Sequence, residues 1–530
     1  MNNTPLSVWT EYEKGRKYNE SLGLYDTVKQ NEDFYIGNQW EGLSTPDLDK
    51  PVMNILQRVV SYQISQVVSD DIAANFTGAD ETLCDILSEE VDRVFEQNHI
   101  KSLNREALRD CAVTGDTAMY IYTDTPEFER PDGLEALGGL NIPETRLKAE
   151  LLQNTNVIFG NPYDRLVQRQ PYIIIAQFLC EGDVKRLAGG KGAILPDGEA
   201  GAYDTPDGDD RRVTLLTRFW KDKDSIKFYK CTRDVEVQGE TDAEQRLYPI
   251  AWMSWNKRKN SYHGQAAITG MIPNQVFVNK LLAMMMHSIQ LNAFPKIFYD
   301  RTKLNQWDNR IGAAIGVAGN PAEVAAAAFK APDMSDQVFA VIDMVIKHTR
   351  ENMGASDAAL GNVKPDNTSA IIAVQKATSA PLELQRLDYY QFIEDYVRIA
   401  LDLMRAKYGT VTRNVKVKDE FGQETETSVP IDFSGVDADE LNIKIDVGEA
   451  AYWSELGQLT TMDNLFDRGL VSPEVYVEGM PGNYIRNKNK ILEELRMREM
   501  APELSDPTGR DLDPSAIRKA NRYIGDLEVI

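Results

Sequence analysis

Helical periodicity dominates the start of the chain. Apolar side chains recur near helical spacing between residues 7 and 35, which predicts one amphipathic helix there. These side chains are Trp9, Tyr12, Tyr18, Leu22 and Tyr25. Residues 52–73 and 79–98 carry a similar pattern and are predicted as two further helices, with polar residues on their solvent faces.

Runs of β-branched and aromatic residues follow, and they predict strands. A stretch rich in glycine, proline and aspartate, residues 198–210, predicts a loop between two of them. The predicted strands are 117–123, 171–178, 212–220, 225–232 and 247–255. Helices and strands together predict a mixed α+β region in the first half of the chain.

An unusually apolar helix is predicted over residues 264–292. It would be split at Gly270, and Pro273 suits the first turn of the second piece, where its missing N–H costs nothing. A helix that is apolar on most sides must be packed on most sides, either in the core of a large domain or as one stave of a multi-subunit barrel. Only a narrow stripe is polar or small: Gln275, Asn279, Ala283, His287 and Gln290, with Lys280 the single charge beside it.

The second half of the chain is predicted to be largely helical. A helix over residues 368–407 would be about 60 Å long, far longer than the average helix of globular domains. The other predicted elements are a strand at 294–300, a helix at 335–353, strands at 411–418 and 441–446 around a turn at 420–423, and helices within 452–500.

Length and composition indicate a folded protein of several domains. The chain has 530 residues, of which 42% are hydrophobic and 26% charged, as in ordinary globular proteins. The N-terminus has no secretory-signal pattern, and the apolar run at 281–286 is too short to span a bilayer. Four widely spaced cysteines fit a reducing cytoplasm.

The charge is distributed unevenly. The formal net charge of −24 argues against general affinity for nucleic acid, although a repulsive wall would let DNA slide past it. Residues 245–299 contain no Asp or Glu, where the average composition predicts roughly eight. The same window holds six bases: Arg246, Lys257, Arg258, Lys259, Lys280 and Lys296. A polyanion nearby or a crowded subunit interface would each disfavour carboxylates here.

The sequence contains no recognisable catalytic or metal-binding constellation. Its four histidines are scattered, and residues 188–193 lack the spacing and the Ser or Thr of a phosphate-binding loop. A structural or binding protein is therefore predicted, with no catalytic residues, no metal and no cofactor. The basic run Lys257–Lys259 has two interpretations: a solvated turn, or contact with nucleic-acid phosphate or an acidic neighbouring subunit.

Four motifs occur in a fixed order along the chain. The first is Phe34-Tyr-Ile-Gly-Asn-Gln-Trp40 followed by Pro51-Val-Met-Asn54. The second is Tyr248-Pro-Ile leading to Tyr262-His-Gly264, with the apolar helix ending in Asn292-Ala-Phe-Pro-Lys-Ile297. The third is Leu360-Gly-Asn362 with Asn367-Thr-Ser-Ala370 before the long helix. The fourth is Asp446-Val-Gly448. In their order and spacing, residues 8–500 resemble the portal proteins of tailed bacteriophages, most closely the short-tailed-phage type.

This resemblance implies a ring, usually of about twelve copies, at one capsid vertex of a virion. Double-stranded DNA would pass through its channel during packaging and ejection, and the large terminase and later a head–tail adaptor would dock on the clip. The major capsid protein is a further implied partner, and a scaffold protein could be another. The ring would assemble in the host cytoplasm, without a membrane, and would hydrolyse nothing.

The resemblance also implies a portal fold, in which a mixed wing domain is joined to long stem and tunnel helices, a small clip and a helical crown-like C-terminus. The wing would comprise residues 1–255 and 410–450, the first stem helix 256–292, the clip 293–334, the second stem helix 335–353, the tunnel loop and tunnel helix 354–409, and the crown-like helices and tail 451–530.

Three groups of site residues follow from the resemblance. The tunnel loop facing DNA would include Ser356, Asp357, Asn362, Lys364, Asp366 and Asn367. The stem and its subunit interface would include Lys257, Arg258, Lys259, Lys280, Met284, Met285 and His287. The clip surface for the terminase and the adaptor would include Lys296, Arg301, Lys303, Trp307 and Arg310.

Two hypotheses and one alternative accompany these residues. Lys364 is expected to line the channel, and Met284, Met285 and Met286 are expected to pack between neighbouring stems. The alternative class is a non-ring cytoplasmic scaffold or a degenerate enzyme of mixed α+β fold. The mass and shape of the particle in solution distinguish the two classes.

Overall fold

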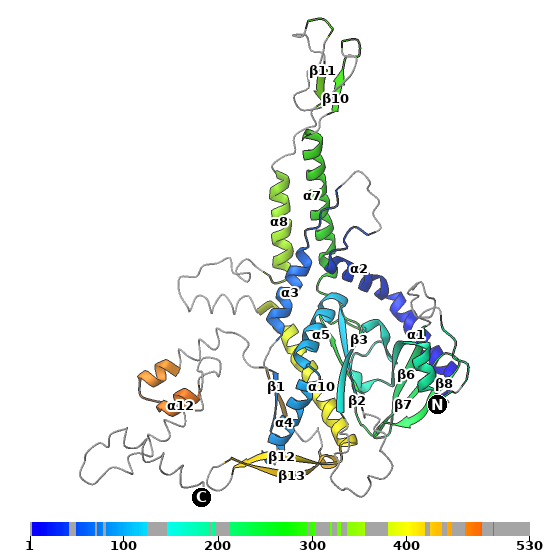
Figure 1. Cartoon of the computed structure of the whole chain (residues 1–530), viewed down its shortest axis with the longest axis vertical. Coiled ribbons are helices and arrows are strands. Elements are labelled where there is room, and N and C mark those ends of the chain that lie inside the picture. Colours follow the sequence, from blue (N-terminus) through cyan, green and yellow to red (C-terminus); the bar gives the residue numbers. More distant parts are fainter. Residues whose placement is uncertain are drawn as a thin grey trace, which may run out of the picture. The chain divides into compact units, whose positions relative to one another are not determined.

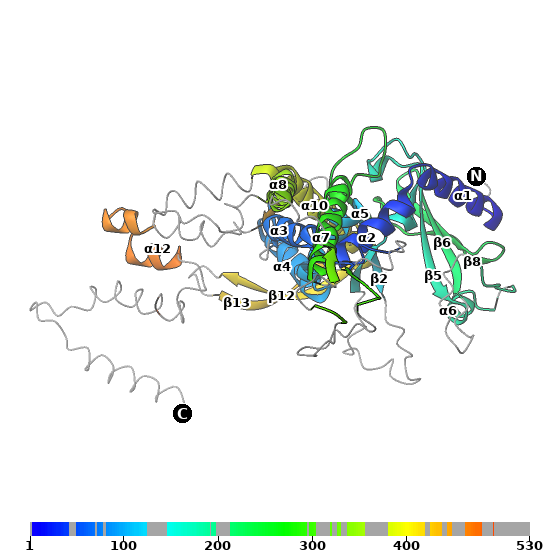
Figure 2. The same cartoon turned by 90° about the horizontal axis from the view of Figure 1, so that it is seen from above.

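The protein is described here from a computed structural model (Figures 1 and 2). The chain divides into two compact units, Met1–Gly448 and Glu449–Ile530. The described parts contain both α-helices and antiparallel sheets, which confirms the predicted α+β class. The described residues are 3–41, 49–68, 72–77, 81–124, 146–190, 192–197, 212–293, 296–303, 318–320, 326–329, 337–355, 380–418, 424–436, 442–447, 462–479 and 491.

The predicted N-terminal helix is two helices. The first is α1 (Pro5–Ser21) and the second is α2 (Leu24–Ile36). Gly23 separates them in the left-handed conformation, with φ at 63°, and only glycine adopts that conformation without strain. Gly37 ends α2 in the same way. The apolar periodicity runs through the break, which is why it predicted one helix.

The next predicted helix, 52–73, is also too long. Helix α3 (Ile55–Val67) begins at its cap Asn54 and ends before strand β1 (Ile72–Thr77). This strand pairs antiparallel with β14 (Asn442–Val447), a partner so distant in sequence that local patterning cannot reveal it. Helix α4 (Glu81–Gln97) agrees with its prediction, whereas α5 (Ile100–Thr114) was not predicted.

Two antiparallel sheets carry the strands of the first half. The smaller has the order β3-β2-β9 and the larger the order β4-β5-β6-β7-β8. The five predicted strands correspond to β2, β5, β6, β7 and β9, while β3, β4 and β8 were missed; the predicted loop 198–210 lies outside the described residues. The bounds are β2 (Asp116–Asp124), β3 (Arg146–Leu152), β4 (Val157–Phe159), β5 (Tyr172–Cys180), β6 (Arg212–Asp222), β7 (Ser225–Cys231), β8 (Glu236–Asp242) and β9 (Ile250–Ser254).

Both sheets are covered on their faces. A shared apolar cluster that includes Phe159, Trp252 and Tyr262 fills the space between the two sheets. Helix α1 covers the other face of the larger sheet through Trp9 and Tyr12. Buried Arg218 of β6 fixes α1 further, because its Nε donates to Glu11 Oε2 at 2.7 Å. Helix α6 (Glu181–Leu187) packs against this sheet in a small cluster of its own.

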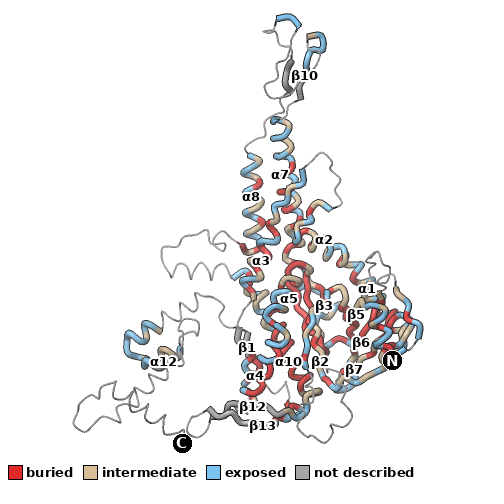
Figure 3. The backbone as a smooth tube through the Cα atoms, viewed as in Figure 1, coloured by how far each residue is buried: buried red, intermediate tan, exposed pale blue. Residues whose placement is uncertain are grey.

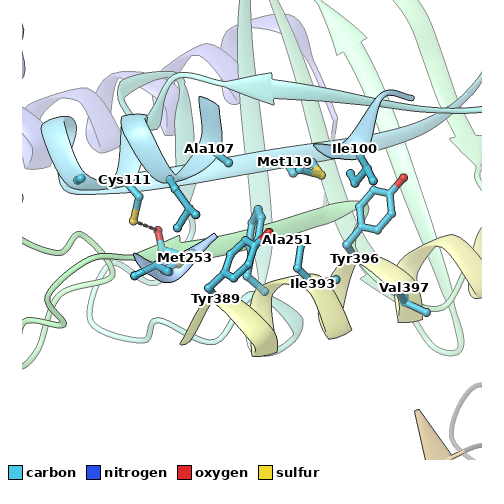
Figure 4. Packing of buried hydrophobic residues seen from close by; sticks show 14 of the residues in the cluster. Ile100, Ala107, Cys111, Met119, Ala251, Met253, Tyr389, Ile393, Tyr396 and Val397 are labelled. Carbon is cyan, nitrogen blue, oxygen red and sulfur yellow. Dashed lines mark hydrogen bonds between the residues drawn. The ribbon is translucent and has the colours of Figure 1, made fainter. Parts of the chain in front are cut away.

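The largest core lies on the free face of the smaller sheet, where α5 and α10 (Glu383–Lys407) pack against it (Figure 4). Met119 and Met253 from the strands meet Cys111 of α5 and Tyr389 of α10 in one buried cluster. The helix predicted over 368–407 is interrupted near Pro381. Helix α10 starts at Glu383, after a 3-10 turn at Ala380–Leu382 that contains a proline, and residues 368–379 lie outside the described residues.

Helix α7 (Ile272–Ala293) is the predicted apolar helix, with Pro273 in its first turn. Its predicted start at Gly264 is wrong, because residues 264–268 form a loop in which Gln265 pairs with Asn256. No side chain fits at Gly264, since a Cβ there would lie 2.7 Å from Ser254 Cβ. Strand β10 (Lys296–Tyr299) follows α7 and pairs antiparallel with β11 (Ala326–Phe329). Helix α8 (Gln337–Asn352) agrees with its prediction.

The remaining described elements lie toward the C-terminus. Strands β12 (Thr410–Lys418) and β13 (Glu424–Asp432) form an antiparallel pair; β13 was not predicted, and the predicted turn between them lies outside the described residues. In the second unit, residues 462–467 and α12 (Pro473–Glu478) are helical. None of the described helices is long and apolar enough to cross a membrane.

A buried carboxylate joins the smaller sheet to the loop before α7. Asp116 of β2 accepts hydrogen bonds from Ser254 Oγ at 2.6 Å and from Gly264 N at 2.7 Å. Its second oxygen lies 2.9 Å from Nδ1 of His263, whose Nε2 lies 3.1 Å from Asn19 Oδ1. Both the Asp116 and His263 side chains are fully buried, so this is an internal anchor rather than an accessible catalytic pair.

Asp116→Ala is expected to lower the free energy of unfolding by about 3 kcal/mol, because it leaves Ser254, Gly264 and His263 without their buried acceptor. Thermal unfolding followed by circular dichroism measures the loss. Asp124→Asn is the matched control, since Asp124 lies on the same strand but pairs with Lys148 at the surface and should leave the melting temperature unchanged. Equal melting temperatures for Asp116→Ala and the unmodified chain would contradict this role.

Candidate functional site

Helix α7 turns its polar stripe inward. Gln275 is 0% exposed, and Asn279 and Ala283 are buried as well. The apolar remainder of the helix was expected to be the packed part, but large apolar side chains on it are exposed. These include Phe277, Met284, Met286 and Ile289. Exposed and buried residues alternate along α7 (Figure 3). Helix α7 thus buries two amides together with Ile272, Val278 and Met285, and leaves several large apolar side chains exposed.

The buried amides of α7 bind a short segment before α3, here named the strap (Asp49–Asn54). Gln275 Nε2 donates to the carbonyl of Met53 at 2.5 Å, and Gln275 Oε1 accepts from the amide of Ile55 at 3.1 Å. Asn279 Oδ1 accepts from the amide of Met53 at 3.3 Å. Higher on the helix, Gln290 donates to Asp49. The strap therefore runs beside α7 and occupies the stripe that a neighbouring helix would otherwise fill.

The first sequence motif supplies the second layer of this network. Gln39 Oε1 accepts from Asn279 Nδ2 at 2.5 Å, while Gln39 Nε2 donates to the carbonyl of Phe34 at 2.9 Å. Asn54 caps α3 and donates to the carbonyl of Tyr35 at 2.8 Å. Trp40 Nε1 donates to the carbonyl of Pro51 at 2.9 Å. The motif residues thus position α7 by hydrogen bonds, a function that their polarity alone did not reveal.

Helix α8 lies beside α7 and is held at its C-terminal end (Figure 1). Asn274 Nδ2 of α7 donates to Thr349 Oγ1 of α8 at 3.0 Å. Gln63 Nε2 of α3 donates to the carbonyl of Met353, just beyond α8, at 2.7 Å. Asn274 and Asn279 are five residues apart, so α8 and the strap meet α7 on sides about 140° apart. The two helices form a fixed pair whose outer surfaces carry exposed Phe339 and Met344 as well.

The basic residues of the acid-free window, residues 245–299, have different surroundings. Lys257 pairs with Asp388 near the start of α10, so one charge of the Lys257–Lys259 run is neutralised within the chain. Arg258 and Lys259 are exposed. Lys280 is exposed on α7 between Phe277 and Met284, and among the described residues it makes no ion pair. The window therefore provides a partly exposed apolar helix on which Lys280 has no anionic partner within the described part of the chain.

The predicted stem residues divide into two groups. Lys257, Arg258, Lys259, Lys280 and Met284 are exposed, and Met284 is 53% exposed. The prediction that Met285 packs between neighbouring stems is wrong. Its side chain is only 8% exposed and belongs to the main core of its own chain. The reason is helical geometry, which points three consecutive residues in three directions. His287 is half-buried.

Most predicted tunnel and clip residues lie outside the described residues. This applies to the whole tunnel-loop group, including Lys364, and to Trp307 and Arg310. Lys296 belongs to β10, Arg301 is exposed and Lys303 is half-buried in the turn after that strand. Within the described residues, no group of three or more His, Cys, Asp or Glu side chains is placed to hold a metal ion.

No protein-family model matches this chain, and no curated protein matches it either. Functional inference therefore depends on the geometry of the α7–α8 pair. Sequence reasoning missed Phe277, Gln39 and Asn54 as members of this site. One signal in the sequence could have revealed them. An apolar helix that contains Gln and Asn needs hydrogen-bond partners for these side chains, and an earlier segment of the chain is rich in Asn and Gln.

Gln275→Ala is expected to lower the free energy of unfolding by about 2 kcal/mol, because the Ile55 amide and the Met53 carbonyl lose a buried partner. The shift in melting temperature measures it. Gln290→Ala is the matched control: it removes the same amide from the same helix, but at an exposed position, and should change stability little. Equal effects of the two substitutions would show that the buried network does not position α7.

Proposed function

We propose that this chain is the subunit of a phage portal ring, as its motifs suggest. The observation that carries the proposal is the set of large apolar side chains exposed on the α7–α8 pair. The buried amides of Gln275 and Asn279 are hydrogen-bonded inside the chain. The large apolar side chains that are exposed to solvent are Phe277, Met284, Phe339 and Met344. Large apolar side chains gathered on a helix pair mark a surface for another protein.

A ring explains why the apolar side chains occur on more than one side of the pair. In a closed ring each copy uses two different surfaces, one for each neighbour, whereas a two-fold dimer uses one surface twice. Met284 and Met286 are two residues apart and so point to nearly opposite sides of α7, and both are exposed. The acid-free window supports the same reading, because carboxylates in a desolvated contact between helices are costly.

In this proposal the ring occupies one capsid vertex of the virion and provides the channel for genome packaging and ejection. Its net negative charge suits a channel that DNA passes without adhering, since clustered cations are what grip phosphate. The large terminase and the head–tail adaptor would dock at the β10–β11 end, where Phe298 and Tyr299 are exposed. The subunit itself catalyses nothing.

The test is the particle formed by the purified chain. Light scattering and negative-stain images should show a ring of about twelve subunits with a central hole. A monomer, or a monomer with hydrolytic activity, would favour the non-ring scaffold or the degenerate enzyme instead.

Met284→Glu is expected to prevent ring assembly while leaving the subunit folded, because the side chain is exposed in one chain and would be desolvated between two. Light scattering should report subunits or small oligomers at concentrations at least about tenfold above those at which the unmodified chain forms rings.

Leu187→Glu on α6 is the matched control. Leu187 is similarly exposed, lies outside the α7–α8 pair, and should assemble normally. Far-UV circular dichroism must be unchanged in both variants. Rings of normal size from Met284→Glu, and also from Phe277→Glu, would contradict the proposed packing of the helix pair.

A further inference from the structure

The strap creates an exposed apolar surface of its own beside α7. Its members are Ile36, Val52, Met53 and Met286, here named the strap patch; all four are exposed, Ile36 to 58%. These residues come from the end of α2, from the strap and from the upper half of α7. Because this surface combines three separate segments, it depends on the tertiary structure, and the residue pattern of a single helix does not explain it.

Hydrogen bonds join the three segments that carry the patch. Asn54 donates to the carbonyl of Tyr35, which brings the strap against the end of α2 next to Ile36. The amide of Met53 donates to Asn279, and Asp49 accepts from Gln290. Met286 lies beside the polar stripe of α7, on the same side of the helix as Asn279 and Gln290, because it is seven residues after the first and four before the second. The strap backbone therefore passes directly beside Met286.

Carboxylates surround this patch. Asp49 lies at the upper end of the strap, and Asp33 and Glu41 lie on either side of the α2 end that contributes Ile36. Glu41 is exposed, and its Oε1 lies 3.8 Å from Nζ of Lys29, so the two side chains form an ion pair at the surface. Lys50 of the strap is exposed next to Asp49. The patch is thus apolar at its centre, and its rim has three carboxylates and two lysines, a net negative charge.

The opposite side of α7 has the complementary character. Phe277, Lys280 and Met284 are spaced by three and four residues, so they form one exposed stripe. This stripe, here named the open face, is apolar at both ends with a cation at its centre. Within the described residues Lys280 has no anionic partner. An apolar surface that carries one unpaired cation matches an apolar surface with an acidic rim.

We propose that the strap patch of one copy receives the open face of α7 from the next copy. The inference rests on the proposed ring and adds the residues of its contact. Each copy would offer the patch on one side of α7 and the open face on the other, which is the head-to-tail arrangement that a closed ring requires. Lys280 would meet the acidic rim, and the strap would set the distance between neighbouring helices.

The experiment is site-directed cross-linking in the full chain. Cys180→Ser is the background, since Cys180 is exposed whereas Cys84, Cys111 and Cys231 are buried. Burial raises the pKa of the Cys231 thiol to about 12 and raises that of Cys111 as well, so both resist maleimides at neutral pH. Val52→Cys and Met284→Cys are introduced singly and together, and assembled rings are treated with a short bis-maleimide.

The double variant should give covalent dimers, trimers and larger species on a denaturing gel, and each single variant should give monomers, because the contact joins two different positions. Val52→Cys with Met344→Cys is the matched control. Met344 is as exposed as Met284 but lies on α8, and this pair should stay monomeric.

Three outcomes would overturn the inference. Intact rings whose Val52→Cys, Met284→Cys chains stay monomeric would exclude the strap contact and leave the ring proposal standing. A ladder from the Met344 pair instead of the Met284 pair would show that α8 faces the strap. Absence of rings from the unmodified chain in negative-stain images would overturn the ring and the strap contact together.

Discussion

The structure around α7 depends on the burial of two side-chain amides. Gln275 and Asn279 have no charge to lose, but each brings donors and acceptors that must be satisfied once water is excluded. The strap and Gln39 satisfy them with hydrogen bonds of 2.5–3.3 Å. Because these partners lie on one side of the helix, the amides fix which side of α7 faces the protein, and Phe277 and Met284 on another side stay exposed.

That constraint links the fold to the proposed function. A helix with ordinary amphipathicity would bury Phe277 and Met284 and would need no neighbour. Here the interior positions are already occupied by the strap, α3 and α8, so the apolar surface remains available to a second copy. The buried anchor at Asp116 and His263 adds rigidity at the base, since it fixes the loop that leads into α7 to the smaller sheet.

Sequence reasoning found most elements but not their limits or their partners. It predicted β2, β5, β6, β7 and β9 from residue type, since buried strands are rich in β-branched and aromatic residues. It extended the first helix across Gly23 because apolar periodicity does not register one residue with positive φ. It missed β1, and extended the preceding helix into its first two residues, because that strand is specified by β14, more than three hundred residues away. For the candidate site, it placed Met284, Met285 and Met286 together at a subunit interface, whereas Met285 is buried in the core of its own chain and the other two are exposed.

The sequence by itself determined that α7 is apolar with a narrow polar stripe and that residues 245–299 contain no Asp or Glu. It also determined that the chain combines helices with strands. These properties are local, so they can be read from composition and spacing. Only the tertiary structure decided that the polar stripe is the inner side. Hydrophobicity alone predicts that the two amides would face water. They are buried because residues from Gln39 to Ile55 provide the hydrogen-bond partners that water would otherwise supply.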